Sequence, residues 1–218
     1  MTPTAHVAAP TKDRPGRSKF VPPVRTLHQS AFDSACAELM RLVEVDYSPT
    51  LVIGIRTGGM VVAQSMIRMA STPLPILTLT CRRGLTEVKS RLKPVRMLLS
   101  ALPQPAADLL RRVEHRLITA PSARRMQSRQ IDRAEAETIG SWATMLPSPA
   151  RILVVDDAVD SGATLATALQ ALRDVCPPDT EIRSAAITQT LDGPIVRPDY
   201  VLHYGTLCRF PWSFDAAR

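Results

Sequence analysis

The sequence has no run of about 18 apolar residues, the length that a membrane helix needs. Residues 1–30 also lack the apolar centre of a secretory signal. We therefore expect no membrane partner and a cytoplasmic location. Cysteines are few and far apart, without a CxxC pair or a histidine at zinc-ligand spacing. We expect reduced, mostly buried thiols at all four positions, which are Cys36, Cys81, Cys176 and Cys208.

Positive charge is concentrated in two segments. Residues 1–25 carry a net charge of +4 and residues 82–133 carry +9, so the remainder of this +7 chain is at −6. With 218 residues and 45% hydrophobic content, the chain can bury one sizeable core. We expect residues 1–25 to form a mobile basic arm, either a solvated tail or a nucleic-acid contact, and residues 26–215 to form one domain.

A buried strand followed by acidic residues dominates the sequence pattern. Residues 152–155 are apolar without alternation, which is typical of a strand in the middle of a parallel sheet. Leu165, Leu169, Leu172 and Val175 then recur at helical spacing. The polar residues between them, 156–164, are predicted to form a strand-to-helix turn. The free N–H groups of such a turn favour a bound phosphate, and Gly162 permits close approach.

Three carboxylates in this turn need a separate explanation. Asp156, Asp157 and Asp160 would repel a bound phosphate unless ribose hydroxyls, a divalent cation or a developing positive charge lay beside them. In the alternative interpretation one aspartate caps the helix and the others are solvated, but that accounts for one acid only.

The stretch Val154 to Leu165 resembles the motif of the type I phosphoribosyltransferases: a hydrophobic strand, two acids, two apolar residues, then Asp-Ser/Thr-Gly-x-Thr. The resemblance implies a site for phosphoribosyl diphosphate. Asp156 and Asp157 would hold the ribose hydroxyls and, directly or indirectly, Mg²⁺. Asp160 would exchange a proton with the nucleobase. The 5′-phosphate would be held by the residues of the turn, Ser161, Gly162, Ala163, Thr164 and Leu165.

A second strand-to-helix turn, rich in glycine, follows the apolar residues 49–55. Arg56, Thr57, Gly58 and Gly59 precede a helical pattern, so a second anion site or ordinary tight packing both fit. The turn resembles the diphosphate loop of the same family. The family keeps a basic residue near the first glycine, whereas here the arginine is displaced to Arg56.

Residues 82–127 occupy the place of the family's mobile catalytic loop but are much longer. Two short apolar faces, around Leu98–Leu102 and Leu109–Leu117, predict a helical insertion between strands. Its basic residues either neutralise the diphosphate or form solvated helix faces. The candidates for the first role are Arg82, Arg83, Lys89, Arg124 and Arg125.

The C-terminal residues are similar to the hood of xanthine-guanine phosphoribosyltransferases, which closes over the purine. Phe210-Pro-Trp212 lies in that position, although Trp212 could equally cover the edge of the sheet. Leu207 stands where the family has a stacking aromatic, and Thr190 stands where it has the lysine that recognises the 6-oxo group. The expected base-binding residues of this hood, about 190–215, are Thr190, Leu207, Phe210 and Trp212.

The predicted fold is therefore α/β: the type I phosphoribosyltransferase fold, with a five-stranded, mainly parallel sheet, helices on both faces, a helical insertion and a small C-terminal hood. The resemblance implies a Mg²⁺-dependent enzyme of purine salvage type, a homodimer or higher homo-oligomer, that transfers a phosphoribosyl group from phosphoribosyl diphosphate to a base-like acceptor. The alternative is a non-catalytic sensor of phosphoribosyl diphosphate that binds nucleic acid through its basic segments.

Overall fold

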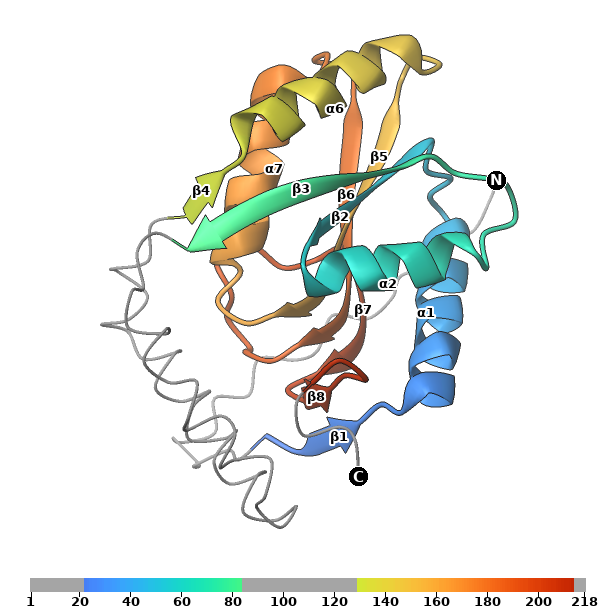
Figure 1. Ribbon diagram of the computed structural model, residues 1–218, viewed down its shortest axis with the longest axis vertical. Helices are drawn as coiled ribbons and strands as arrows, with labels where there is room; N and C mark the ends of the chain where they lie inside the picture. Colours follow the sequence, from blue (N-terminus) through green and yellow to red (C-terminus); the bar gives the residue numbers. More distant parts are fainter. Residues whose placement is uncertain (1–21, 84–128, 214–218) are drawn as a thin grey trace, which may run out of the picture.

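A computed structural model describes residues 22–83 and 129–213 (Figure 1). Within them four helices alternate with strands in the order expected of an α/β chain. The helices are α1 (Gln29–Glu44), α2 (Gly58–Ile67), α6 (Arg133–Met145) and α7 (Ala163–Val175). The strands are β1 (Val24–Thr26), β2 (Leu51–Arg56), β3 (Ile76–Arg83), β4 (Arg129–Ile131), β5 (Arg151–Val159), β6 (Glu181–Gln189), β7 (Tyr200–Tyr204) and β8 (Leu207–Arg209).

Six strands form the main sheet in the order β4-β3-β2-β5-β6-β7. Five of them, β3, β2, β5, β6 and β7, run parallel, which confirms the predicted five-stranded parallel core. The sixth, β4, is short and pairs antiparallel with the end of β3, with Cys81 opposite Ile131. The sequence did not predict β4, because three residues of strand carry no periodicity.

Helices cover both faces of this sheet (Figure 1). The first core joins α1 and α2 to the sheet, and Phe32, Leu39 and Met66 are almost fully buried in it. The second core lies under α6 and α7 on the opposite face and includes Ile139 and Leu172. Residues 152–155 contribute to both cores in alternation, which explains why this part of β5 is apolar at four consecutive positions.

A second, two-stranded sheet pairs the start of the described chain with its end. β1 and β8 run parallel, with Val24 opposite Leu207 and Thr26 opposite Arg209. Val24 and Arg25, the last residues of the predicted arm, therefore belong to a strand. This small sheet lies beside the lower end of α1, as seen in Figure 1. Of its two strands, β8 falls within residues 190–215, the range predicted for the hood.

The four cysteines form no disulfide among the described residues. Cys36 and Cys208 are buried, and Cys81 and Cys176 are partly buried. Among residues 22–83 and 129–213, no helix is long and apolar enough to cross a bilayer.

Candidate functional site

The two predicted phosphate-binding turns follow neighbouring strands in the middle of the sheet. β2 and β5 are neighbours, but the chain leaves β2 through α2 toward β3 and leaves β5 through α7 toward β6. The connections therefore diverge at the carboxyl ends of these two strands, where open α/β sheets bind ligands. Both turns, 56–59 and 156–164, were predicted from positions about 100 residues apart in the sequence.

The glycine turn is packed directly against the acidic strand. A β-carbon placed on Gly58 would lie 2.0 Å from Oδ2 of Asp157, and one on Gly59 would lie 2.4 Å from the carbonyl oxygen of Val155. Only glycine fits at these two positions without displacing a neighbour. Helix α2 begins at Gly58, so its first N–H groups lie next to the two aspartates.

Asp156 and Asp157 lie inside β5 rather than in a turn, because the strand continues to Val159. Asp156 is buried, with 8% of its surface exposed. Its Oδ1 accepts a hydrogen bond from the backbone N–H of Asp157 at 3.0 Å. Oδ1 of Asp157 likewise accepts from the N–H of Ala158 at 3.0 Å. These two side chains therefore bind backbone N–H groups of the strand that carries them.

The two aspartates also perturb each other electrostatically. Burial, and then the adjacent Asp157 carboxylate, raise the pKa of Asp156 well above its ordinary value. Burial likewise raises the pKa of Asp157. A pair of carboxylates held in this way is poorly solvated without a ligand. Hydroxyl donors or a cation would relieve this cost.

The turn between β5 and α7, which was predicted to bind the 5′-phosphate, is held by contacts with residues 195–196. Gly162 has a positive φ of 75° immediately before the first residue of α7, so the chain turns sharply into the helix. Ser161 accepts a hydrogen bond at its carbonyl oxygen from the N–H of Ile195, at 2.7 Å. A β-carbon on Gly162 would lie 2.5 Å from the carbonyl oxygen of Val196.

Residues 195–196 therefore pack against the turn that was predicted to bind phosphate. The sequence did not predict this contact. No local pattern marks this segment, apart from the flanking Pro194 and Pro198. Leu165, by contrast, was predicted as a phosphate-binding residue, and the structure buries its side chain in the core with 1% exposed. Only its backbone N–H could serve an anion.

Asp160 and Thr190 form a direct side-chain pair. The Thr190 hydroxyl donates to Oδ1 of Asp160 at 2.6 Å, and the Thr190 N–H donates to the carbonyl oxygen of Val159 at 3.0 Å. Thr190 is buried, with 7% exposed. The sequence placed these two residues in one site on different grounds, as proton acceptor and as base-binding residue, and did not anticipate their contact.

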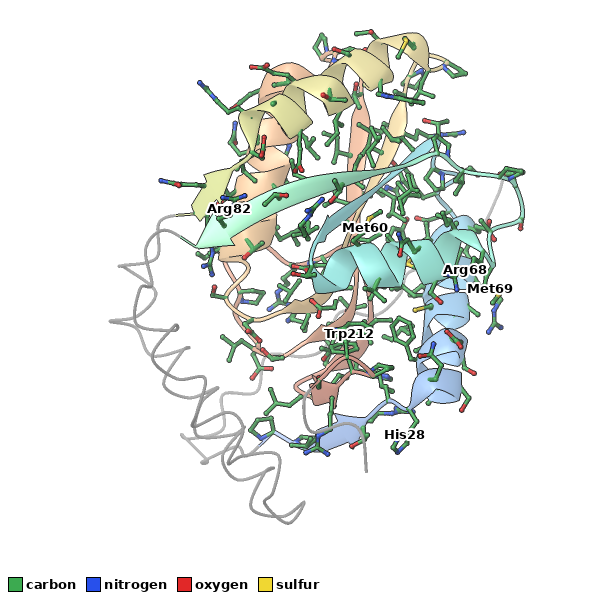
Figure 2. All side chains as sticks on the ribbon, viewed as in Figure 1. His28, Met60, Arg68, Met69, Arg82 and Trp212 are labelled. Atoms are coloured by element: carbon green, nitrogen blue, oxygen red, sulfur yellow. The ribbon has the colours of Figure 1, made fainter. Side chains whose placement is uncertain are left out.

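The aromatic residues of the hood pack on each other. Trp212 stacks on Phe210 with ring centres 4.9 Å apart, and its edge meets Phe32 of α1 at 5.2 Å. Leu207 and Phe210 are buried, whereas 40% of Trp212 is exposed. Figure 2 shows Trp212 between the small sheet and α2. The indole therefore packs on Phe32 and Phe210 of the first core and keeps one accessible surface.

The basic candidates fall into three groups. Arg56 is exposed at the end of β2, and its peptide bond to Thr57 is cis. Arg82 and Arg83 belong to β3, where they pair with Gln130 and Arg129. Their assignment to a flexible loop was wrong, because the antiparallel contact with β4 extends the strand. Lys89, Arg124 and Arg125 lie outside the described residues.

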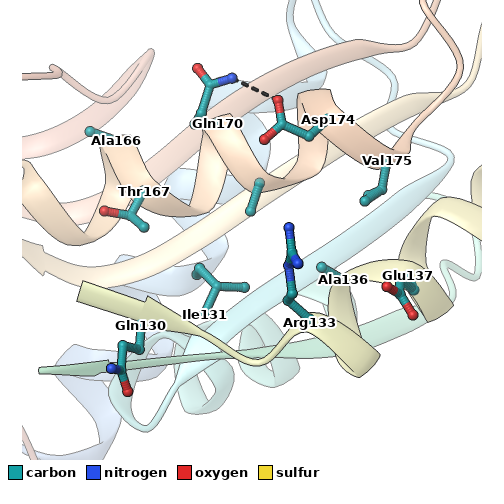
Figure 3. Close-up of a pocket in the computed structure, with 11 residues that line it drawn as sticks. Gln130, Ile131, Arg133, Ala136, Glu137, Ala166, Thr167, Gln170, Asp174 and Val175 are labelled. Atoms are coloured by element: carbon teal, nitrogen blue, oxygen red, sulfur yellow. Dashed lines mark hydrogen bonds between the residues drawn. The ribbon is translucent and has the colours of Figure 1, made fainter. Parts of the chain in front are cut away.

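A separate groove of about 910 Å³ lies between α7, α6 and β4 (Figure 3). Ala136, Ala166 and Ala171 contribute small apolar side chains, and Arg133 extends from α6 toward α7. None of the predicted site residues lines this groove.

Comparison with known proteins agrees with the geometry. Residues 26–215 match the family model of the phosphoribosyl transferase domain. The chain therefore belongs to the phosphoribosyltransferase family, a family of enzymes that transfer a phosphoribosyl group from phosphoribosyl diphosphate to a base. A search of curated proteins by sequence found no match.

Several solved structures share the fold at low sequence identity. A purine phosphoribosyltransferase from Pyrococcus horikoshii has a TM-score of 0.55 and 17% identity, over 87% of this chain and 93% of the other. The xanthine-guanine-hypoxanthine phosphoribosyltransferase of Helicobacter pylori has a TM-score of 0.53 and 17% identity, over 88% and 95%. A hypothetical protein from Neisseria gonorrhoeae with bound ppGpp has a TM-score of 0.53 and 13% identity, over 88% and 90%.

Proposed function

We propose that this chain is an active transferase in which each part of the site has a distinct role. Phosphoribosyl diphosphate binds with its 5′-phosphate on the turn from Ser161 to Thr164. Asp156 and Asp157 hold its ribose hydroxyls. The diphosphate lies against the amides of Gly58 and Gly59, with Arg56 beside it. The acceptor base lies between Asp160 and the hood.

The reaction breaks the bond from C1 of the ribose to the diphosphate oxygen and forms a bond from C1 to a ring nitrogen, with inversion. Pyrophosphate leaves, and the ring proton of the base passes to a carboxylate oxygen of Asp160. Because the transition state resembles a ribosyl cation, the protein mainly positions the two reactants and excludes water.

Mg²⁺ fits this site as an ion shared with the substrate. Asp156 and Asp157 offer the carboxylate oxygens that Mg²⁺ prefers. The described residues contain no cluster of three or more metal-ligating side chains, so these residues alone do not build a complete cage there. Magnesium commonly binds through one or two carboxylates together with substrate phosphates, and when bound it neutralises the leaving diphosphate.

The observation that carries the proposal is the contact of Gly58 and Gly59 with the acidic strand β5. A sugar that bears phosphate at one end and diphosphate at the other needs two anion sites with hydroxyl acceptors between them. Gly58 and Gly59 pack on Asp157 and Val155, and Gly162 immediately precedes α7, six residues beyond Asp156. The carboxylates therefore lie between the N-termini of two helices.

Calorimetry with phosphoribosyl diphosphate and Mg²⁺ tests the site directly. We expect saturable binding to the wild-type chain and a loss of at least about tenfold in affinity in Asp156→Asn and Asp157→Asn, because an amide cannot accept two hydroxyls as a carboxylate does. Asp192→Asn, which changes an exposed acid, is the matched control. Unchanged affinity in both site variants would refute the assignment.

Pyrophosphate release in the presence of a panel of bases then separates an enzyme from a sensor. Turnover with any base supports the transferase. Tight binding of phosphoribosyl diphosphate without turnover on any base would favour the sensor interpretation. The basic arm and insertion that such a sensor needs lie mostly outside the described residues, and no contact in the described part of the chain favours it.

A further inference from the structure

Residues 190–196 lie alongside the turn that joins β5 to α7. The regular pairing of β5 with β6 ends at Val159. Beyond it, the Thr190 N–H donates to the carbonyl oxygen of Val159 at 3.0 Å, and the Ile195 N–H donates to that of Ser161 at 2.7 Å. Backbone hydrogen bonds between the two segments therefore continue past the end of the sheet and into the turn.

Contacts within this segment hold it in place independently of the turn. The side-chain amide of Gln189 donates through Nε2 to the carbonyl oxygen of Leu191 at 2.8 Å. The Arg197 guanidinium donates to the carbonyl oxygen of Asp192 at 2.6 Å. Because both ends of the segment are fixed in this way, it can act as a support for the turn.

The bond from Ile195 fixes the orientation of the peptide unit between Ser161 and Gly162. This peptide bond is trans, since the cis bonds of the described chain lie elsewhere. In a trans peptide the C=O and the N–H point in opposite directions. The Ser161 carbonyl oxygen faces Ile195, so the Gly162 N–H points away from it.

The Gly162 N–H is a donor in need of an acceptor. Gly162 is buried, and among the described residues no acceptor bonds to its N–H. Buried N–H groups are nearly always paired in folded proteins, so an acceptor from outside the chain would complete this one. If the peptide turned over, the Gly162 N–H would instead face the Ile195 N–H, and a carbonyl oxygen would take its place on the opposite side.

Val196 leaves no room on the supported side of the turn. A β-carbon on Gly162 would lie 2.5 Å from the carbonyl oxygen of Val196 and 2.8 Å from its nitrogen. Gly162 also has a positive φ of 75°, which favours glycine. The backbone of residues 195–196 is thus in direct contact with the peptide unit whose orientation decides whether the turn presents a donor or an acceptor.

We propose that Ile195 is a positioning residue for the 5′-phosphate and acts through its backbone N–H. This inference rests on the proposed function, which places the 5′-phosphate on the turn from Ser161 to Thr164. The bond to Ser161 holds the Gly162 N–H as a donor to phosphate, beside the first N–H groups of α7. The Ile195 side chain is 67% exposed, so the role requires an N–H at this position rather than a particular side chain.

Two substitutions at the same position separate the N–H from the side chain. Ile195→Pro removes the N–H, and Ile195→Ala keeps it. In calorimetry with phosphoribosyl diphosphate and Mg²⁺, we expect Ile195→Pro to bind at least about tenfold more weakly than the wild-type chain, because a charge-assisted hydrogen bond to the phosphate is lost. Ile195→Ala should restore the affinity to within about twofold of wild type. Thermal unfolding of the same samples shows whether each variant is folded.

A measurement on the wild-type chain alone gives a second test, which holds even if Ile195→Pro does not fold. The chain has nine glycines, so labelling them with ¹⁵N gives few amide signals. On titration with phosphoribosyl diphosphate and Mg²⁺, the Gly162 amide proton should move downfield as it bonds to the phosphate. The signal of Gly193, whose β-carbon position has nothing within 4 Å, should stay in place.

The possible failures can be told apart. If the wild-type chain binds phosphoribosyl diphosphate but the Gly162 signal does not move, the positioning role is wrong and the proposed function stands. The same holds if Ile195→Pro folds and binds like the wild type, or if Ile195→Ala loses as much affinity as Ile195→Pro. Absence of binding by the wild-type chain would refute the proposed function and this inference with it.

Discussion

Gly58 and Asp157 come from opposite halves of the chain and are in such close contact that a single methyl group at Gly58 would overlap the carboxylate. A β-carbon at Gly58 would lie 2.0 Å from Oδ2 of Asp157, while one at Gly59 would meet backbone, the Val155 carbonyl oxygen, at 2.4 Å. The same substitution at these adjacent positions therefore has different consequences, because a side chain can rotate and a strand cannot.

Gly58→Ala should impair function more than stability. The Asp157 carboxylate can turn aside, which displaces a group proposed to hold ribose, and a misplacement of about 1 Å can lower turnover by about 100-fold. Gly59→Ala should instead lower the free energy of unfolding by about 1–3 kcal/mol, as overpacking against backbone does.

Thermal unfolding and pyrophosphate release, measured side by side, distinguish the two effects. Gly193→Ala is the control, since nothing lies within 4 Å of its β-carbon position. If Gly58→Ala retained full turnover, the proposed role of Asp157 in binding would be wrong.

Because the Asp156 carboxylate is buried, we expect the folded chain to become more stable when this group is neutralised, by an amount that depends on pH. Burial and the Asp157 charge raise the pKa of Asp156 in the folded chain, so the folded state binds this proton more tightly than the unfolded state. The stability that protonation provides is present below the ordinary aspartate pKa and is lost as the pH rises through the folded value.

Asp156→Asn keeps an oxygen acceptor for the Asp157 N–H and never ionises. Without ligand, the variant should melt about 2–4 °C above the wild-type chain near neutral pH, the change that about 1 kcal/mol gives in a chain of this size. The difference should shrink as the solution is made acidic. Calorimetric melting curves at several pH values check this, with Asp192→Asn as control, and a variant less stable than the wild type at neutral pH would contradict it.

Substitution of Tyr47 should lower the stability of the fold and leave the proposed binding site intact. Its buried hydroxyl lies 3.0 Å from the carbonyl oxygen of Ile152 and 2.9 Å from that of Glu181, at the amino ends of β5 and β6. Tyr47→Phe leaves both oxygens without this donor, so we expect a loss of about 1–3 kcal/mol in the free energy of unfolding.

The affinity for phosphoribosyl diphosphate should stay within about twofold of wild type, because the proposed site is at the other ends of these strands. Urea unfolding and calorimetry measure the two quantities. Tyr204→Phe, which alters an exposed tyrosine, should change neither. A large drop in affinity in Tyr47→Phe would show that the amino and carboxyl ends of the sheet are coupled.

The sequence predicted those parts of the fold that depend on local pattern. The apolar run at 152–155, the helical spacing from Leu165 to Val175 and the two glycine-bearing turns are local features. The sheet and the helix are confirmed, whereas the predicted turn 156–164 is shorter than expected, because β5 continues to Val159. Long-range pairing was not predictable. Arg82 and Arg83 extend β3 only because residues 129–131 lie alongside them. β1 and β8 likewise pair across some 180 residues of sequence without any alternation to mark either strand.

In the candidate site, too, residues marked by a local pattern could be predicted, whereas long-range contacts could not. Asp156, Asp157 and Asp160 could be selected because carboxylates next to a phosphate turn require a chemical reason. The contact of Thr190 with Asp160 could not, since it joins the ends of two strands that the sequence places 30 residues apart. The buried state of Leu165 and the packing of Trp212 on Phe32 are also tertiary facts that override what a motif suggests.

Asp160 supplies the last prediction, which separates proton transfer from substrate binding. If its carboxylate takes the ring proton of the acceptor, Asp160→Asn should lower turnover by about 100-fold to 10,000-fold. The affinity for phosphoribosyl diphosphate should change little, because the ribose and phosphate contacts belong to other residues. The amide can still accept the Thr190 hydrogen at its oxygen, so the local bond at 2.6 Å need not be lost. Single-turnover measurements of pyrophosphate release, together with calorimetry on the same samples, test both halves. A variant that binds and turns over like the wild type would remove Asp160 from the mechanism, and one that fails to bind would assign it to holding the sugar instead.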